Sequence, residues 1–245
     1  MTSKALQVVK TVYSATWGKY VFAGMYDRFL KKFEAAGLSQ KRAEFIAPAY
    51  GRTLELGAGT GLNLPHYPDA VTEMVISEPY PHMVVKLAEK VEELDLTQTV
   101  QLTVSPAEKI PFPDNSFDTV VAAMILCTVK DPEPVLAEIE RVLKPGGQYL
   151  FLEHVRNPDP KIARKQDFIQ PGWFLFGNEC HCNRPTVETL QASGLKIEEL
   201  KHDKIPGAAA WIEAMVTGVA KAVKTGHSSS SNGATAHTDK SVKAL

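Results

Sequence analysis

An apolar run that ends in alternating glycines constrains this chain more than any other feature. The residues Thr53-Leu54-Glu55-Leu56 are followed by Gly57, Gly59 and Gly61. Such a run is typical of a buried parallel strand, and glycines at its carboxyl end let a ligand approach the backbone closely. The sequence therefore predicts a nucleotide-binding turn directly after a central strand.

The spacing of these glycines argues against a dinucleotide. The G-x-G-x-x-G fingerprint has a third glycine for helix–strand packing, and Leu62 occupies that place here. The pattern is E-x-G-x-G-x-G instead, and we expect the Glu55 carboxylate to point into the loop. A carboxylate repels a pyrophosphate and favours an ammonium group, so the ligand is expected to carry an amino acid rather than phosphates.

A second acidic residue indicates that the ligand also carries a sugar. The short strand predicted at Met74-Val75-Ile76 ends just before Glu78. This glutamate follows Gly57 by about 20 positions, the separation at which an acidic residue accepts hydrogen bonds from a ribose. An amino acid and a ribose without a phosphate clamp describe S-adenosylmethionine.

With these residues the sequence resembles the class I S-adenosylmethionine-dependent methyltransferases from about Tyr26 to about Lys221. The stretch 107–118 is similar to the loop before the family's fourth strand, and 141–147 is similar to the turn before the fifth. The resemblance implies S-adenosylmethionine as methyl donor and S-adenosylhomocysteine as product. The cofactor-binding residues expected on both grounds are Glu55, Gly57, Gly59, Thr60, Gly61, Asn63, Glu78, Pro79, Met83, Pro106, Ala107, Glu108, Leu126 and Cys127.

Two of these positions carry open alternatives. Met83 follows Glu78 by about one helical turn and suits either the adenosine or the core, because methionine fills both roles. Pro106 stands where the family often has aspartate, which leaves the acceptor for the adenine amino group unassigned.

Strands alternate with helices along the chain, which predicts an α/β fold with a Rossmann-like, doubly wound parallel sheet and ligands at its carboxyl edge. The resemblance implies seven strands, mostly parallel, with an antiparallel last strand. In the helix expected at 38–49, Ser39 is the predicted N-cap and Arg42 lies on the outer face. The expected strands are 53–56, 74–76, 100–104, 117–125, 148–154, 195–200 and 213–220, and the other expected helices are 81–94 and 135–143.

The 245 residues suit a single globular domain with short extensions. Residues 1–37 are expected to form helices that pack on the domain or close over the cofactor as a lid; adsorption to a membrane surface is the weaker alternative. Residues 38–224 are expected to form the methyltransferase domain. Residues 225–245 have almost no large apolar side chains, which predicts a disordered tail.

Charge and cysteine content limit the partners and the compartment. A formal net charge of −1 gives no electrostatic footprint for nucleic acid, so a small-molecule acceptor is expected. Three cysteines and the lack of a signal sequence or long apolar run favour a cytoplasmic protein, for which membrane association is not predicted. A monomer or a homodimer is compatible with the sequence.

The candidate catalytic residues are His154, Tyr26 and His181. His154 ends the expected fifth strand, where an imidazole could act as a general base near neutral pH; a structural histidine bonded to a neighbouring loop is the alternative. Tyr26 would reach inward from the lid, and His181 would lie in the acceptor pocket.

The stretch 157–184 is rich in aromatic residues, including Phe168 and Trp173, and is expected to supply an apolar wall for a hydrophobic small molecule. Its Cys180-His181-Cys182 segment lacks the C-x-x-C pairs of a structural zinc site. The sequence therefore predicts no metal site, and two buried, inert thiols are expected there.

Three stretches narrow the resemblance to thiol S-methyltransferases and their bacterial relatives, namely 124–130, 152–155 and 180–184. A thiol is the acceptor expected first. The alternatives are N- or O-methylation of a small molecule or phospholipid, C-methylation of a quinone, and a binding protein that senses the cofactor without catalysis.

Overall fold

The computed structural model describes residues 28, 30–94, 96 and 98–223. The predicted tail, most of the predicted lid and Tyr26 lie outside these residues, so those expectations stay predictions.

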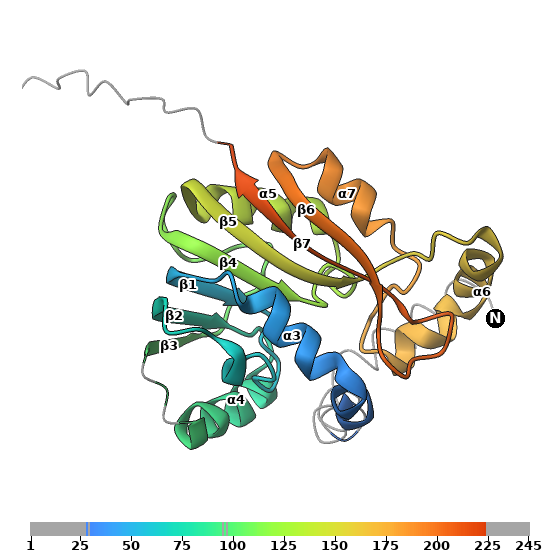
Figure 1. The fold of residues 1–245 in the computed structure, drawn as a ribbon, viewed down its shortest axis with the longest axis horizontal. Coiled ribbons are helices and arrows are strands. Elements are labelled where there is room, and N and C mark those ends of the chain that lie inside the picture. Colours follow the sequence, from blue (N-terminus) through green and yellow to red (C-terminus); the bar gives the residue numbers. More distant parts are fainter. Residues whose placement is uncertain (1–27, 29, 95, 97, 224–245) are drawn as a thin grey trace, which may run out of the picture.

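A seven-stranded sheet forms the centre of the described part of the chain (Figure 1). The strand order is β3-β2-β1-β4-β5-β7-β6, and β7 runs antiparallel to both of its neighbours while the other pairs are parallel. The predicted fold class and the antiparallel hairpin at the end of the chain are thereby confirmed. The strands are β1 (Gly51–Leu56), β2 (Val71–Ser77), β3 (Thr99–Thr103), β4 (Phe117–Ala123), β5 (Leu143–His154), β6 (Leu195–Lys204) and β7 (Ala214–Ala222).

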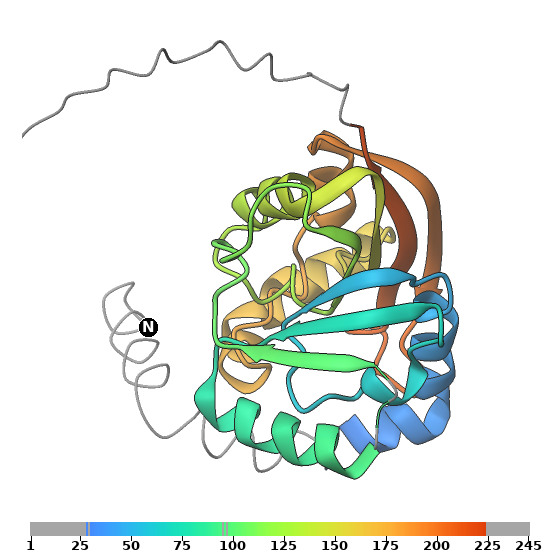
Figure 2. The same ribbon diagram turned by 90° about the vertical axis from the view of Figure 1, so that its left-hand side faces the viewer.

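Helices cover both faces of the sheet (Figure 2). Side chains alternate along each strand, so Leu54 and Leu56 pack with α5 and α7, whereas Met74 and Ile76 pack with α3 and α4. Among the described residues, no helix combines the length and apolarity needed to span a bilayer. The helical elements are η1 (Glu34–Leu38), α3 (Ser39–Ile46), η2 (Leu64–His66), α4 (Pro81–Leu94), α5 (Pro132–Val142), α6 (Pro160–Phe176) and α7 (Thr186–Ala192).

The start of α3 differs from the prediction. Ser39 is not an N-cap, because η1 runs directly into α3 after a kink at Gly37, whose φ is 122°. Arg42 is buried rather than outward-facing. Its guanidinium donates hydrogen bonds to Glu34 and to Asn63 at 3.0 and 2.8 Å, and these partners offset the cost of burying the charge. The expected amphipathic pattern failed here because a polar network lies beneath the helix.

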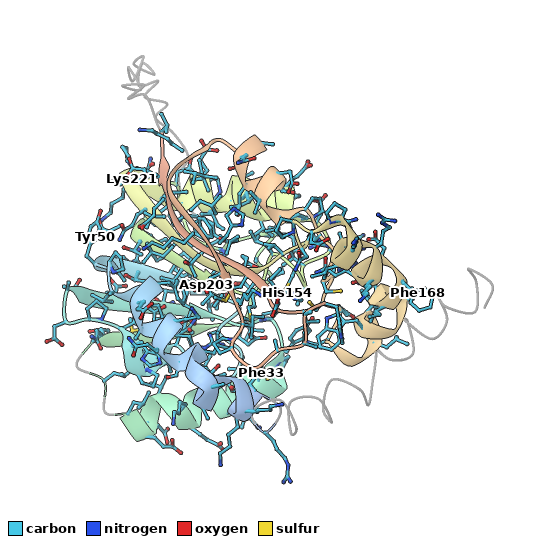
Figure 3. All side chains as sticks on the ribbon, turned by 45° about the vertical axis from the view of Figure 1, so that its right-hand side comes forward. Phe33, Tyr50, His154, Phe168, Asp203 and Lys221 are labelled. Carbon is cyan, nitrogen blue, oxygen red and sulfur yellow. The ribbon has the colours of Figure 1, made fainter. Side chains whose placement is uncertain are left out.

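The aromatic stretch forms α6, which lies beyond the end of the sheet rather than against one of its faces (Figure 1). The carboxylate of Asp159 caps the helix by accepting a hydrogen bond from the Lys161 N–H at 2.7 Å. Phe168 is 88% exposed and points outward, so it is not part of a pocket wall (Figure 3). Trp173, one turn further along, faces the site and packs edge-on against Trp211.

Candidate active site

A cavity of about 380 Å³ lies at the carboxyl edge of the sheet. This is the position at which doubly wound sheets hold their ligands, and the volume suits a small molecule. Its walls come from the strand ends, α6 with its following loop, the β6–β7 loop and the segment before α3. The lining includes Leu30, Phe33, Leu38, Gly57, Gly59, Glu78, Pro79, Met83, Ser105, Pro106, Ala107, Glu108, Met124, Ile125, Cys127, Val129, His154, Trp173, Cys180, Ile205, Ala208 and Ile212.

One half of the cavity has the groups expected for an adenosyl cofactor. The φ angles of Gly57 and Gly59 are 63° and 59°, so the turn brings backbone rather than side chain to the cavity. The buried Glu78 carboxylate accepts hydrogen bonds from the N–H groups of Gly59 and Tyr80 at 2.8 and 3.0 Å. These bonds fix both oxygens and leave lone pairs for a ribose. Burial raises the pKa of Glu78 above its ordinary value.

Next to Glu78 the wall becomes apolar, as a purine ring requires. Met83 is buried and reaches the cavity from α4, so it serves both the core and the site. Pro106 and Ala107 face it from the loop after β3, and a hydrogen bond of 2.9 Å between the hydroxyls of Ser77 and Ser105 ties that loop to β2. The residues present therefore fit S-adenosylmethionine on this side.

The Glu55 carboxylate bonds to the segment that follows the glycine turn. Strand alternation sends its side chain to the face that α3 covers, where its carboxylate accepts hydrogen bonds from Asn63 at 2.8 Å and Tyr67 at 2.9 Å. Burial raises the pKa of this carboxyl. Among the described residues that line the cavity, neither Glu55 nor Asn63 occurs. The acidic residue of the motif thus holds the chain after the glycine turn, and its contact with an ammonium group stays a prediction.

Three other expected contacts also lie off the cavity wall. Thr60 is buried behind the turn. A Cβ on Gly61 would come within 2.9 Å of Leu64 and 3.0 Å of Leu87, so this glycine allows close packing of α4 rather than approach of a ligand. Leu126 is fully buried and contributes its backbone to the turn that follows β4.

That turn, residues 124–129, is held by a buried carboxylate that the sequence analysis did not identify. Both Glu153 oxygens accept hydrogen bonds from the Leu126 N–H at 3.1 Å, and one accepts from the Ile125 N–H at 3.1 Å. Burial raises the pKa of Glu153 to about 8. Met124 enters the turn with φ 58°, which is uncommon for a side chain of this kind. The sequence feature that could have identified Glu153 is its charge within an otherwise apolar part of β5.

Replacing Glu153 tests its role. Glu153→Leu should destabilise the protein by about 3 kcal/mol, because two buried N–H groups lose their acceptor at about 1–3 kcal/mol each. Glu153→Gln keeps one acceptor oxygen and should lose less than half as much. The free energy of unfolding from urea denaturation measures both. Equal losses in the two variants would contradict this role.

The carbonyl side of the same turn is held by the loop after α6. Arg184 donates hydrogen bonds to the carbonyls of Leu126 and Val129, the latter at 2.8 Å. The backbone N–H of His181 donates a hydrogen bond to the Cys127 carbonyl at 2.7 Å. The His181 ring packs edge-on against Phe174, and burial lowers the pKa of this ring. His181 is not among the described residues that line the cavity, and its catalytic role stays a prediction.

His154 does reach the cavity, from the end of β5 (Figure 3). Its Nδ1 lies 3.4 Å from the Cys180 sulfur, and the ring is 4% exposed. A hydrogen bond from the Cys127 thiol lowers the pKa of Cys180 well below its ordinary value, and contact with His154 acts in the same direction. Sequence reasoning placed each of these residues separately and did not bring them together.

The expected pair of inert thiols at Cys180 and Cys182 is divided in the structure. Cys180 faces the cavity, whereas the Cys182 thiol donates a hydrogen bond to the Gln170 side-chain carbonyl at 3.2 Å. Burial raises the pKa of Cys182 to about 12, which disfavours the reactive thiolate form. Cys180 is the one of the two that belongs to the site.

Comparisons with known proteins agree with this geometry. Residues 54–151 match the model of a methyltransferase domain. The human thiol S-methyltransferase TMT1B is 34% identical over 84% of this chain and 85% of its own length. A phosphatidylethanolamine N-methyltransferase from Cereibacter sphaeroides is 41% identical over 51% of this chain and 61% of its own length. A Thermotoga maritima structure described as a possible histamine N-methyltransferase aligns with a TM-score of 0.61 at 24% identity, over 82% of this chain and 97% of that one.

Proposed function

The chain belongs to the class I S-adenosylmethionine-dependent methyltransferases, and we propose that it transfers the methyl group to the sulfur of a small, hydrophobic thiol. The observation that carries the acceptor class is the apolar half of the cavity. Val129, Trp173 and Ile212 line it, together with Ile205 and Ala208 from the β6–β7 loop. The match to a thiol S-methyltransferase over most of both chains supports the same choice.

The protein's part in such a reaction is mainly positioning. The bound cofactor supplies an electrophilic methyl group on a sulfonium. Glu78 would orient the ribose end, and the glycine turn would let the ligand lie against the backbone. The apolar side chains around Trp173 exclude water from the acceptor half. Alignment of the reacting atoms accounts for a large part of the rate in a displacement of this kind.

A thiol acceptor is also compatible with the proton acceptors that the site contains. A free thiol with a pKa of about 8.5 is a few per cent ionised at neutral pH, and the thiolate is strongly nucleophilic, so a strong base is unnecessary. The carboxylate of Glu78 accepts hydrogen bonds from two backbone N–H groups and faces the expected ribose, and that of Glu153 is buried behind the turn. His154 lies against Cys180. An alcohol would need a proton acceptor that these groups do not readily provide.

Transfer of a labelled methyl group to a matched panel tests the proposal. Each aliphatic or aryl thiol is paired with the alcohol of the same carbon skeleton, and amines, phenols, a quinol and phosphatidylethanolamine vesicles complete the panel. We expect methylation of apolar thiols at least about tenfold faster than of their alcohol partners, a difference of about 1.4 kcal/mol in the barrier. Product mass identifies the methylated atom.

The other outcomes discriminate among the alternatives. Transfer only to amines, phenols, quinol or lipid would keep the methyltransferase and overturn the thiol. Cofactor binding by calorimetry without transfer to any acceptor would favour a sensor. A Trp173→Ala variant should lose rate with bulky apolar thiols more than with small ones, because it removes part of the acceptor wall.

A further inference from the structure

Two thiols and an imidazole meet at one wall of the cavity. Cys127 comes from the turn after β4, His154 from the end of β5, and Cys180 from the loop after α6. One potential ligand atom from each lies within 4.8 Å of the other two, and all three side chains are buried. The same three residues line the cavity. No single stretch of sequence contains this set, which is why the spacing of Cys180 and Cys182 alone predicted no metal site.

The dimensions of the cluster match those of a tetrahedral metal site. Zinc binds thiolate sulfur at about 2.3 Å and imidazole nitrogen at about 2.0–2.1 Å, which places two ligand atoms of a tetrahedron about 3.5–3.8 Å apart. The distance between the Cys180 sulfur and the His154 Nδ1 is 3.4 Å. The remaining distances are no more than 4.8 Å, so a small inward movement of the side chains suffices.

The ligands are also held in place through their backbones. The Cys127 carbonyl accepts from the His181 N–H at 2.7 Å, and the Cys180 carbonyl accepts from the Gln170 side chain at 3.1 Å. The Nε2 of His154 is buried without a hydrogen-bond partner among the described residues, so no protein group draws the ring away from Cys180. The two carbonyl contacts therefore position the cysteine ligands, whereas the outer nitrogen of the His154 ring lacks, within the described part of the chain, the partner that metal-bound imidazoles usually have.

We propose that Cys127, His154 and Cys180 bind a zinc-like divalent cation and leave its fourth position open to the cavity. Two thiolates and an imidazole are soft and borderline ligands that suit zinc, and three protein ligands with one open position are the pattern of catalytic zinc sites. Two thiolates would balance the charge of the cation. Binding therefore releases to solvent the cysteine protons that the metal-free site still holds.

The fourth position suits the acceptor, and this part rests on the proposed function. An acceptor thiol that coordinates the cation gives its proton to solvent and keeps a sulfur lone pair for the methyl carbon. The new bond between the acceptor sulfur and the methyl carbon then forms as the methyl–sulfonium bond breaks. The electron pair of the broken bond stays on the cofactor sulfur. The product thioether is neutral and binds the cation more weakly than a thiolate, which aids its release.

Metal content of the full-length protein tests the site without reference to activity. The chain is expressed with zinc, purified under a non-thiol reductant and analysed by elemental mass spectrometry, and we expect about one zinc per chain. Exchange with cobalt should give intense thiolate-to-cobalt charge-transfer absorption and the visible bands of a tetrahedral site. Little or no bound metal, with no charge-transfer band on cobalt titration, would overturn the proposal.

The variants Cys127→Ser, Cys180→Ser and His154→Gln should each lower the zinc content at least tenfold at a fixed chelator concentration. Cys182→Ser is the matched control, because its thiol is buried two residues from Cys180 but contacts Gln170. It should keep its zinc. The midpoint of urea unfolding verifies that each variant is folded. If one variant does not fold, the cobalt titration of the unaltered chain decides the question. A Cys127–Cys180 disulfide in the intact mass would also overturn the proposal.

The two proposals fail in different ways. A thiol added to the cobalt protein should shift the charge-transfer spectrum, whereas the alcohol of the same skeleton should not. Bound metal without methylation of any thiol would overturn the acceptor class and leave the metal site. Methylation of thiols by a metal-free protein would overturn the metal site and leave the acceptor class.

Discussion

Glu78→Ala should weaken S-adenosylmethionine binding by about 100-fold or more, because hydrogen bonds to a charged acceptor contribute about 1.5–3 kcal/mol each. The loss has two sources. The ribose hydroxyls lose their acceptor, and the N–H groups of Gly59 and Tyr80 lose the carboxylate that orders the turn. Titration calorimetry with the cofactor measures the affinity.

Two further variants isolate the effect. Glu78→Gln keeps one acceptor oxygen and should lie between the wild type and Glu78→Ala. Glu93→Ala removes an exposed carboxylate near the end of α4 and should leave the affinity unchanged. An affinity in Glu78→Ala equal to that of Glu93→Ala would refute the assignment of Glu78 to the ribose.

The same carboxyl predicts a pH dependence. The ionised form accepts the ribose hydrogen bonds, so affinity is full above the pKa of Glu78 and falls as the pH drops through it. Because burial raises that pKa, the fall should begin at a higher pH than for an exposed glutamate. Affinity measured from pH 4 to pH 8 should show this fall in the wild type, and Glu78→Gln should lack it.

Gly57→Ala should both destabilise the fold and disrupt the site. Its φ of 63° costs an alanine about 1–2 kcal/mol. The added Cβ would also lie 2.4 Å from the Cγ2 of Ile125, a buried and stiff β-branched side chain whose backbone Glu153 holds. Overpacking of this kind adds about 1–3 kcal/mol, and cofactor affinity should fall at least about tenfold as the turn shifts.

Gly146→Ala is the control for Gly57→Ala. Its φ is 75°, yet a Cβ there meets nothing within 4 Å, so only the backbone cost of about 1–2 kcal/mol applies. Ile125→Ala should partly rescue Gly57→Ala, since it removes the clashing methyl group. A double-mutant cycle on unfolding free energies should give about 0.5–3 kcal/mol of favourable coupling. Additive losses would mean that the clash is relieved elsewhere.

Most of the fold was predictable because strand and helix patterns are local. The helix at 81–94 was predicted with its observed bounds, and the order of strands along the chain was correct. The strand ends that differ from the prediction lie in stretches without alternating apolar residues. β5 begins at Leu143, across a Lys-Pro-Gly-Gly sequence that predicts a turn, and β6 continues to Lys204 through exposed, charged residues at the sheet edge.

The cofactor half of the site was largely predictable, and the acceptor half was not. Gly57, Gly59 and Glu78 follow their strands at fixed spacings, so the sheet places them without further information. The hydrogen bonds of Glu55 to Asn63 and Tyr67 were not predicted, because these partners come from the chain that folds back after the turn. Glu153 and Arg184 come from separate elements and both hydrogen-bond to the turn 124–129. Sequence spacing does not predict such long-range contacts.

The turn 124–129 belongs to both halves of the cavity, since Met124 and Ile125 lie near the glycine turn and Cys127 and Val129 lie toward the acceptor. On the proposed function, donor and acceptor would therefore bind to opposite ends of one short, tightly hydrogen-bonded segment. If binding of one ligand shifts this segment and so changes the affinity for the second ligand by some factor, binding of the second ligand changes the affinity for the first by the same factor. Such a reciprocal linkage would make the affinity for the spent cofactor depend on whether the acceptor has left.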